Sequence, residues 1–280
     1  MHLPHETALV VLSGGQDSTT CLYRALRTHS EVHAITFDYG QRHRREIESA
    51  VRIAKLAGVA SHEVVTLPEH VLHSTSPLVS DNELAQYKDH HSLPGGIEKT
   101  FVPLRNQLFL TLAANRAVEL GADFVYTGVC EEDFGGYPDC RREFIDALEV
   151  AIHLSNGREA RRVHIQTPLM KLTKAKTVQL ALMMPGCYGA LAFSHTSYDG
   201  TYPPRGRDHA NLLRAKGFEE ADVPDPLILR AWLEDKMELP NTANYRQALQ
   251  DAYSPTVAAM MQRVEEFEMK SLKETFHVHD

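Results

Sequence analysis

The stretch Val10-Val11-Leu12-Ser13-Gly14-Gly15-Gln16-Asp17-Ser18-Thr19-Thr20 decides how this chain begins to fold. Its apolar start is typical of a buried strand, and a helix is expected to begin near Ser18. Gly14 and Gly15 allow a sharp turn in which several amide N–H groups point at one anion, and the helix adds the positive end of its dipole. The hydroxyls of Ser13, Ser18 and Thr19 supply further donors. We therefore expect this loop to hold a pyrophosphate.

A plainer explanation of the same loop is a Gly-Gly turn that joins a strand to a helix, with Asp17 or Ser18 as the N-cap. The loop is not a Walker loop, because no Gly-Lys-Ser or Gly-Lys-Thr occurs in it. Its glycine spacing also differs from the dinucleotide-binding fingerprint. Motifs elsewhere in the sequence are therefore needed to distinguish a simple turn from a phosphate-binding site.

Apolar runs recur along the chain, and the intervals between them have helical periodicity. This pattern is typical of a parallel sheet that is covered on both faces. Strands are expected at 8–12, 32–37, 62–67, 124–129 and 163–166, and helices at 19–27, 44–56, 106–120, 141–154 and 173–184. The prediction is an α/β fold with a doubly wound five-stranded parallel sheet and a C-terminal helical extension that ends in a helix over 244–274.

The periodicity fails over 68–100, where His, Ser, Pro and Gly accumulate. Such an insertion is either a mobile lid or an ordinary surface loop, and the sequence does not choose between them. After residue 184 the composition changes to Gly, Pro, Tyr and charged residues. We therefore expect a first domain over 1–184, with the insertion inside it, and a C-terminal region over 185–280.

Bulk composition favours a small-molecule substrate. The 280-residue chain has a formal net charge of -8, which disfavours a surface built to neutralise many phosphates, so a bulk nucleic-acid partner is not expected. No long apolar run or export signal is seen, so we expect a cytoplasmic protein and no membrane partner. Its four cysteines, Cys21, Cys130, Cys140 and Cys187, form no Cys-x-x-Cys pair and fit reduced thiols.

The string Ser13-Gly14-Gly15-Gln16-Asp17-Ser18 resembles the SGGxDS motif of the PP-loop ATP-pyrophosphatase superfamily. That superfamily has a HUP-like fold, splits ATP to AMP and pyrophosphate, and adenylates its substrate. Further strings, 36–46, 100–106, 127–141 and 167–174, resemble the QueC family of the queuosine pathway. Members of that family make 7-cyano-7-deazaguanine from 7-carboxy-7-deazaguanine, ATP and ammonia. The resemblance therefore implies an ATP-dependent carbon–nitrogen ligase that uses Mg²⁺.

The resemblance also suggests which residues hold ATP. All these strings fall at or just after the carboxyl ends of predicted strands, where open parallel sheets bind ligands. Lys171 and Lys174 can neutralise the charge that develops on phosphate, together with Asp17 and Ser18 of the loop. The expected ATP-binding residues are Ser13, Gly14, Gly15, Gln16, Asp17, Ser18, Thr19, Asp38, Tyr39 and Gly128.

The stretch from Asp133 to Arg141 suits a deazaguanine. Its guanine-like edge offers adjacent N–H donors to Asp133 or Asp139, and Phe134 or Tyr137 can stack on its flat face. Asp139 alternatively caps a helix. Arg105 is expected to bind the substrate carboxylate, or to pair with a surface glutamate. The expected substrate-binding residues are Arg105, Asn106, Asp133, Phe134, Tyr137, Pro138, Asp139 and Arg141.

The chain departs from the QueC family at its four-cysteine zinc site. The corresponding positions hold Ser197, Arg205, Asp208 and Asn211, although the flanking residues persist. Arg cannot ligate zinc, and Ser and Asn are poor ligands, so a tetrahedral thiolate site is excluded. Hydrogen bonds, or an ion pair of Arg205 with a carboxylate, are expected to replace the metal. A substitute zinc site built from His195, Asp208 and His209 is the alternative.

The missing thiolates leave the amine that accepts the acyl group open. One alternative is a zinc-free, antiphage paralogue that conjugates the deazaguanine to a protein amine, since QueC-like proteins also occur among antiphage genes. Another is a tRNA-modifying PP-loop enzyme, although neither a basic surface nor a Cys-x-x-Cys pair is present. A third is a nucleotide-binding sensor without chemistry. By analogy with the family, a homodimer is expected.

Overall fold

The computed structural model describes residues 6–68, 71–80, 82–93, 96–131, 136–157 and 161–250. Five parallel strands form one sheet in the order β3-β2-β1-β4-β5, which confirms the predicted doubly wound α/β fold. The strands are β1 (Thr7–Val11), β2 (Glu31–Asp38), β3 (Ser61–Thr66), β4 (Phe124–Tyr126) and β5 (His164–Gln166). The strand order reverses between β1 and β4, and this reversal is where such sheets bind ligands.

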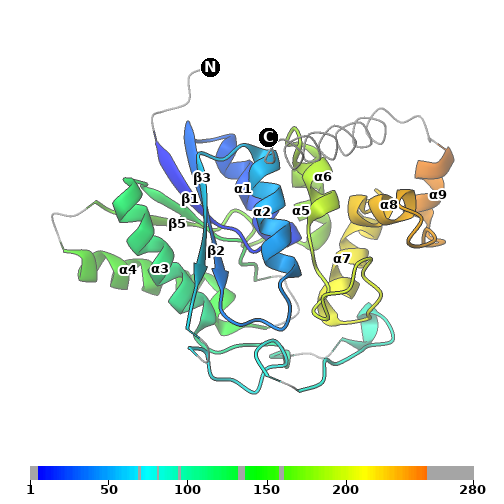
Figure 1. Cartoon of the computed structure of the whole chain (residues 1–280), viewed down its shortest axis with the longest axis horizontal. Coiled ribbons are helices and arrows are strands. Elements are labelled where there is room, and N and C mark those ends of the chain that lie inside the picture. Colours follow the sequence, from blue (N-terminus) through cyan, green and yellow to red (C-terminus); the bar gives the residue numbers. More distant parts are fainter. Residues whose placement is uncertain are drawn as a thin grey trace, which may run out of the picture.

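Successive residues of β1 explain how both faces of the sheet are covered, because side chains alternate between the faces of a strand. Ala8 and Val10 pack with α1 (Gln16–Leu26) and α2 (Arg45–Ala57). Leu9 packs on the opposite face with α3 (Arg105–Leu120) and α4 (Arg142–Asn156). Figure 1 shows these two helix pairs on either side of the sheet.

Most element boundaries differ from the prediction by one to three residues, and two of these differences matter for the site. Helix α1 begins at Gln16, because the extended Gly15 is its N-cap and the Gly15 carbonyl accepts a hydrogen bond from the Thr19 amide at 3.1 Å. The alternative that Asp17 or Ser18 caps this helix is therefore wrong. Strand β4 ends at Tyr126 instead of residue 129, so the following residues leave the sheet.

The C-terminal region packs on the sheet-containing part of the chain through a shared core. It contains α6 (Cys187–Ala190), α7 (His209–Glu220), α8 (Pro226–Leu233) and α9 (Ala243–Gln250), and it follows α5 (Lys174–Leu182). Val178 of α5, Leu191 and Phe218 of α7 are buried in one cluster. The helix predicted over 244–274 lies largely outside the described residues, and its described part is α9.

Helices α7 and α8 were not predicted, although each begins with a recognisable signal. The Asp208 carboxylate accepts a hydrogen bond from the Asn211 amide, and the Asp225 carboxylate accepts one from the Leu227 amide. Both are N-caps, and Pro226 occupies the first turn of α8. The two helices are short, and the glycines and prolines around them obscure the periodicity.

The described part of the insertion is held by hydrogen bonds along the carboxyl ends of the strands. The Arg42 amide donates to the Leu78 carbonyl at 3.2 Å. Further along, the Tyr87 amide donates to the Arg207 carbonyl at 2.9 Å. Figure 1 shows this cyan segment reaching α7 on its way from β3 to α3, and it includes the short helix η1 (His90–Ser92).

None of the helices in the described part of the chain is both long and apolar enough to cross a bilayer.

Candidate functional site

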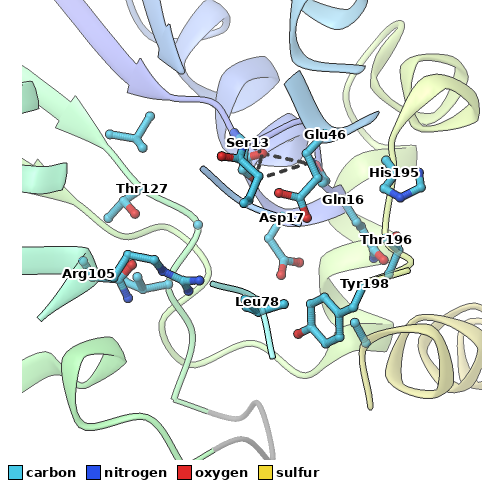
Figure 2. A pocket seen from close by; sticks show the side chains of 18 of the residues that line it. Ser13, Gln16, Asp17, Glu46, Leu78, Arg105, Thr127, His195, Thr196 and Tyr198 are labelled. Atoms are coloured by element: carbon cyan, nitrogen blue, oxygen red, sulfur yellow. Dashed lines mark hydrogen bonds between the residues drawn. The ribbon is translucent and has the colours of Figure 1, made fainter. Parts of the chain in front are cut away.

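A cavity of about 340 Å³ opens at the carboxyl ends of the strands, beside the point where the strand order reverses. Its walls come from the loop after β1, the segments after β2 and β4, the start of α3, the loop over 195–198, and α7. Figure 2 shows Arg105, Asp17 and Tyr198 pointing into it from different elements. Chain segments far apart in the sequence therefore converge on one site, as the sequence predicted.

The loop after β1 is held in shape by its own hydroxyl groups. The Ser18 hydroxyl donates to the Gly15 carbonyl at 3.2 Å and lies 3.0 Å from the Ser13 hydroxyl. The Thr19 hydroxyl donates to the Gly15 carbonyl at 2.7 Å, and Thr19 is fully buried. These hydroxyls thus fold the loop, while the Gln16 amide nitrogen Nε2 is buried without a partner among the described residues.

Two glycines permit the close packing around this loop. Gly14 has a φ of +82°, and a Cβ there would lie 2.2 Å from the Glu46 carbonyl oxygen of α2. Gly128 follows β4, and a Cβ there would lie 3.0 Å from the Ser18 amide nitrogen. Any side chain at either position would push apart the elements that form the cavity.

Lys174 and Asp17 pair across the cavity wall. Nζ of Lys174 lies 2.6 Å from Oδ2 of Asp17, and both side chains are about one-fifth exposed, at 17% and 24%. The pair joins the first turn of α1 to the first turn of α5. It places a cation next to the loop, where phosphate charge would be neutralised.

Arg105 lies at the start of α3 among polar side chains that face the same cavity. Burial by itself lowers the pKa of the Arg105 guanidinium, but Tyr39, Tyr137 and Asp139 raise it above its ordinary value. Arg105 also lowers the pKa of the Asp139 carboxyl, which burial raises. The guanidinium is therefore a permanent cation inside the cavity, suited to a carboxylate.

Asp139 and Tyr137 organise the floor near Arg105. Oδ2 of Asp139 accepts a hydrogen bond from the Asn106 amide at 3.3 Å, so Asp139 caps α3 rather than the helix that follows it. The Tyr137 hydroxyl lies 2.6 Å from the Thr100 hydroxyl. Tyr137 and Asn106 line the cavity, whereas Asp139 lies behind them.

The structure brings part of the predicted set to the cavity and leaves part outside its wall. Predicted residues that line it are Ser13, Gly15, Gln16, Asp17, Ser18, Tyr39, Arg105, Asn106, Gly128, Tyr137 and Lys174. Predicted residues that are described but do not line it are Gly14, Thr19, Asp38, Pro138, Asp139, Arg141 and Lys171. Asp133 and Phe134 lie outside the described residues.

Asp38 and Lys171 are placed in ways that their sequence positions do not reveal. Asp38 is buried beneath the cavity wall, and its carboxylate lies 3.1 Å from Nη1 of Arg44. Lys171 is exposed and Lys174 is half-buried at the cavity, although both follow β5. Of the two lysines, only Lys174 lines the cavity.

Several residues that line the cavity were not among the predicted site residues. Glu46 enters from α2, Leu78 from the insertion, and His195, Thr196 and Tyr198 from the loop before α7. The loop over 194–198 is tied to the phosphate loop, because the His195 amide donates to the Gly14 carbonyl at 2.9 Å. Glu46 stands within the string 36–46 quoted for the family resemblance, which is the signal that could have found it.

The positions that correspond to the zinc ligands form a hydrogen-bonded cluster. Nδ2 of Asn211 lies 3.1 Å from the Ser197 hydroxyl and 3.1 Å from Oδ2 of Asp208. Arg205 is exposed, and it makes no ion pair with any described residue. Nε2 of His195 donates to the Ser197 carbonyl at 2.8 Å. Hydrogen bonds thus join three of the four positions, whereas Oδ1 of Asn211 is buried without a hydrogen-bond partner among the described residues.

Among the described residues, only Glu149, His153 and His164 place three potential metal-ligand atoms within 4.8 Å of one another. Oε2 of Glu149 already accepts from the Ile165 amide at 2.7 Å, and Nε2 of His153 lies 2.9 Å from the Val163 carbonyl. His195, Asp208 and His209, the alternative set of zinc ligands, do not form such a cluster.

The sheet order, the glycine loop and the cavity at the strand reversal define a PP-loop α/β protein that binds a nucleotide. A family model described as "Queuosine biosynthesis protein QueC" matches residues 7–222. The chain belongs to the QueC family.

Two relatives that share about half of their residues with the chain agree with this membership. The chain is 52% identical over 222 residues to a 7-cyano-7-deazaguanine synthase of Gloeobacter violaceus, covering 79% of this chain and 94% of the relative. It is 50% identical over 235 residues to the 7-cyano-7-deazaguanine synthase of Chromobacterium violaceum, covering 82% and 96%. A solved NMN synthetase from Francisella tularensis is 16% identical, with a TM-score of 0.41 and coverage of 91% and 87%.

Proposed function

We propose that this chain uses ATP to adenylate the carboxylate of 7-carboxy-7-deazaguanine and couples the acyl group to ammonia, giving the amide and then the nitrile. The relatives at about half identity are named for the nitrile product. The observation that carries the proposal is Arg105, a cation inside the cavity that faces the phosphate loop (Figure 2). A carboxylate held by this guanidinium lies within one cavity with the pyrophosphate site.

Adenylation needs positioning and charge neutralisation rather than a side-chain nucleophile. A carboxylate oxygen of the substrate attacks the α-phosphate, and pyrophosphate leaves with the electrons of the broken P–O bond. Lys174, at the phosphate loop, stabilises the charge that develops on the phosphates. Mg²⁺ bound with ATP would neutralise part of the phosphate charge beside the loop after β1, and it would need few ligands from the protein.

The deazaguanine ring is proposed to lie between Tyr137 and the start of α3. Tyr137 offers a flat face for stacking, and its ring is backed by Phe101 with 5.2 Å between ring centroids. Asn106 lines the same part of the cavity. Asp133 and Phe134 remain proposed contacts of the ring, from the stretch outside the described residues.

The chain is proposed to work without zinc. The Asn211 side chain donates hydrogen bonds to both Ser197 and Asp208. These bonds are proposed to stabilise this part of the chain in place of a metal. Treatment with a strong zinc chelator is expected to leave the melting temperature and the activity unchanged. Elemental analysis of the purified protein should find less than about 0.1 zinc ion per chain.

The test of the function is pyrophosphate release from ATP, measured with and without 7-carboxy-7-deazaguanine. Release that depends on the acid supports the proposal, and its complete absence refutes it. Arg105→Lys, which keeps the charge but loses the planar fork, is expected to weaken release about 10-fold or more. Arg44→Lys serves as the control, because Arg44 is an exposed arginine outside the cavity wall.

Mass spectrometry of the product decides which amine accepts the acyl group. A nitrile or amide after reaction with ammonium supports the proposed reaction. A deazaguanine adduct on a protein amine, with no small-molecule product, supports the antiphage paralogue instead. The departure at the zinc positions is the one feature that favours this second candidate. Tight, salt-sensitive binding of tRNA would support a tRNA-modifying enzyme.

A further inference from the structure

Glu46 is a carboxylate that the fold holds beside the phosphate loop. It is the second residue of α2, and its carbonyl oxygen would lie 2.2 Å from a Cβ on Gly14. The backbone of α2 therefore packs directly on the loop, and the position of Glu46 relative to the loop is fixed. Its side chain lines the cavity, and Figure 2 shows Glu46 next to the loop.

The Glu46 carboxylate has no protein partner in the described part of the chain. It accepts no hydrogen bond there and makes no ion pair within 4.0 Å. Asp17, the other carboxylate that lines the cavity within the described residues, instead lies 2.6 Å from Lys174. Glu46 is half-buried and faces the cavity, so its carboxylate oxygens are open to whatever occupies the cavity. Glu46 is thus available for a ligand or for a proton.

Other titratable groups face Glu46 from each element around the cavity. Arg105 of α3 lowers the Glu46 pKa, but burial outweighs it and raises that pKa to about 7. Glu46 in turn raises the pKa values of Tyr39, after β2, and Tyr198, before α7, which burial already raises. Asp17 of α1, Lys174 of α5, Arg42 after β2 and Arg214 of α7 are the other charged side chains of the described wall.

The proposed coupling reaction creates a need for a base at this place. An amine attacks only with a free lone pair, yet amines with a pKa above neutrality carry an extra proton at pH 7. After the attack, the nitrogen that is now bonded to the acyl carbon must also lose a proton before AMP leaves. A group with a pKa near the working pH transfers such protons best.

Four other titratable side chains that line the cavity are poorer candidates: His43, His195, Tyr39 and Tyr198. His195 is buried and its pKa is lowered to about 4, and its Nε2 already bonds the Ser197 carbonyl. The pKa of His43 is lowered by burial. Tyr39 and Tyr198, with raised pKa values, remain protonated at neutral pH and cannot accept a proton.

We propose that Glu46 is the catalytic residue that accepts the proton of the attacking amine. This inference rests on the proposed function. The lone pair of the nitrogen forms the bond to the acyl carbon, and the bond from that carbon to the AMP oxygen breaks with its electrons on AMP. The proton released by the nitrogen goes to the Glu46 carboxylate, and later to solvent. The same carboxylate attracts ammonium into the cavity before the reaction.

The test measures adenylation and acyl transfer to the amine separately in the variant Glu46→Gln. Exchange of labelled pyrophosphate into ATP, dependent on the deazaguanine acid, reports adenylation alone. Amide formation with ammonium reports the second half. Glu46→Gln is expected to keep the exchange rate within about threefold and to lose about 10²- to 10⁴-fold in amide formation, the usual range for general base catalysis. The wild-type pH profile should rise through about pH 7, and Glu46→Gln should lack that rise.

Two additional measurements sharpen this result. Hydroxylamine, which is already unprotonated at neutral pH, is expected to restore most of the acyl-transfer rate in Glu46→Gln. Glu48→Gln is the matched control, because Glu48 lies in the same helix, is exposed, and pairs only with Arg45 at 3.5 Å. Glu48→Gln should match the unaltered protein in both half-reactions.

Different failures have different meanings. If the unaltered protein shows no exchange, the proposed function itself fails. If it shows exchange but Glu46→Gln loses exchange as strongly as amide formation, Glu46 acts on ATP, and the inference is overturned. The inference is also overturned if Glu46→Gln forms the amide at the normal rate, or if hydroxylamine gives no recovery.

Discussion

Asp225→Ala removes one half of an ion pair that lies inside the protein. Oδ2 of Asp225 lies 2.6 Å from Nε of Arg214, and the second guanidinium nitrogen lies 2.8 Å from Oδ1. Both side chains are only 4% exposed. Arg214 also donates to the hydroxyls of Ser194 and Thr196, at 2.7 and 2.8 Å. The pair therefore ties α8, beyond the family match over 7–222, to the wall of the cavity.

The expected loss follows from these contacts. Removing one partner of a buried pair leaves an uncompensated charge and costs about 3–5 kcal/mol. Asp225 is also the N-cap of α8, which adds about 1 kcal/mol, so the total is about 4–6 kcal/mol. That is a large share of an ordinary stability of about 5–15 kcal/mol. With a slope of about 3 kcal/mol per molar, the urea midpoint should fall by roughly 1.3–2 M.

Equilibrium unfolding in urea, followed by circular dichroism, measures this loss. Glu220→Ala is the control, because its pair with Lys216 spans 3.6 Å at the surface of α7, and Glu220 is 50% exposed. Such a pair contributes less than about 0.5 kcal/mol. Arg214→Met combined with Asp225→Leu should be more stable than Asp225→Ala alone, since no buried charge remains. A loss below about 1 kcal/mol in Asp225→Ala would refute the reasoning.

Three further predictions follow from the site. Lys174→Met is expected to slow the pyrophosphate release that depends on the deazaguanine acid about 10²- to 10³-fold, because it removes the cation at the loop. An unchanged rate of pyrophosphate release would contradict this role. Gly128→Ala should lower the melting temperature by several degrees and weaken ATP binding, because its Cβ would lie 3.0 Å from the Ser18 amide. His195 has its folded-state pKa lowered to about 4 by burial, so its contribution to stability is complete above pH 6.5 and is lost as the pH falls toward 4. Unfolding in urea at pH 7.5 and pH 5.0 should therefore show a smaller acid-induced loss for His195→Gln than for the unaltered protein, and equal losses would disprove it.

Local sequence was sufficient to predict the sheet and its phosphate loop. The five strands lie within a few residues of their predicted ranges, because apolar runs and their helical intervals are read over short windows. The loop over Ser13–Ser18 was found by its own residues, since two glycines between a strand and a helix already determine the turn. The strings that identify the family are likewise contiguous, and the family model confirms them.

Only the folded chain decided which side chains meet. Lys174 and Asp17 are 157 residues apart, and no local pattern distinguishes Lys174 from the exposed Lys171. Glu46 looks like an ordinary charged residue in the first turn of a helix, until the contact of α2 with Gly14 places it at the cavity. The strand pattern thus follows from local backbone and side-chain preferences, whereas the raised pKa of Glu46 depends on burial and on Arg105 from a distant element, which sequence spacing cannot encode.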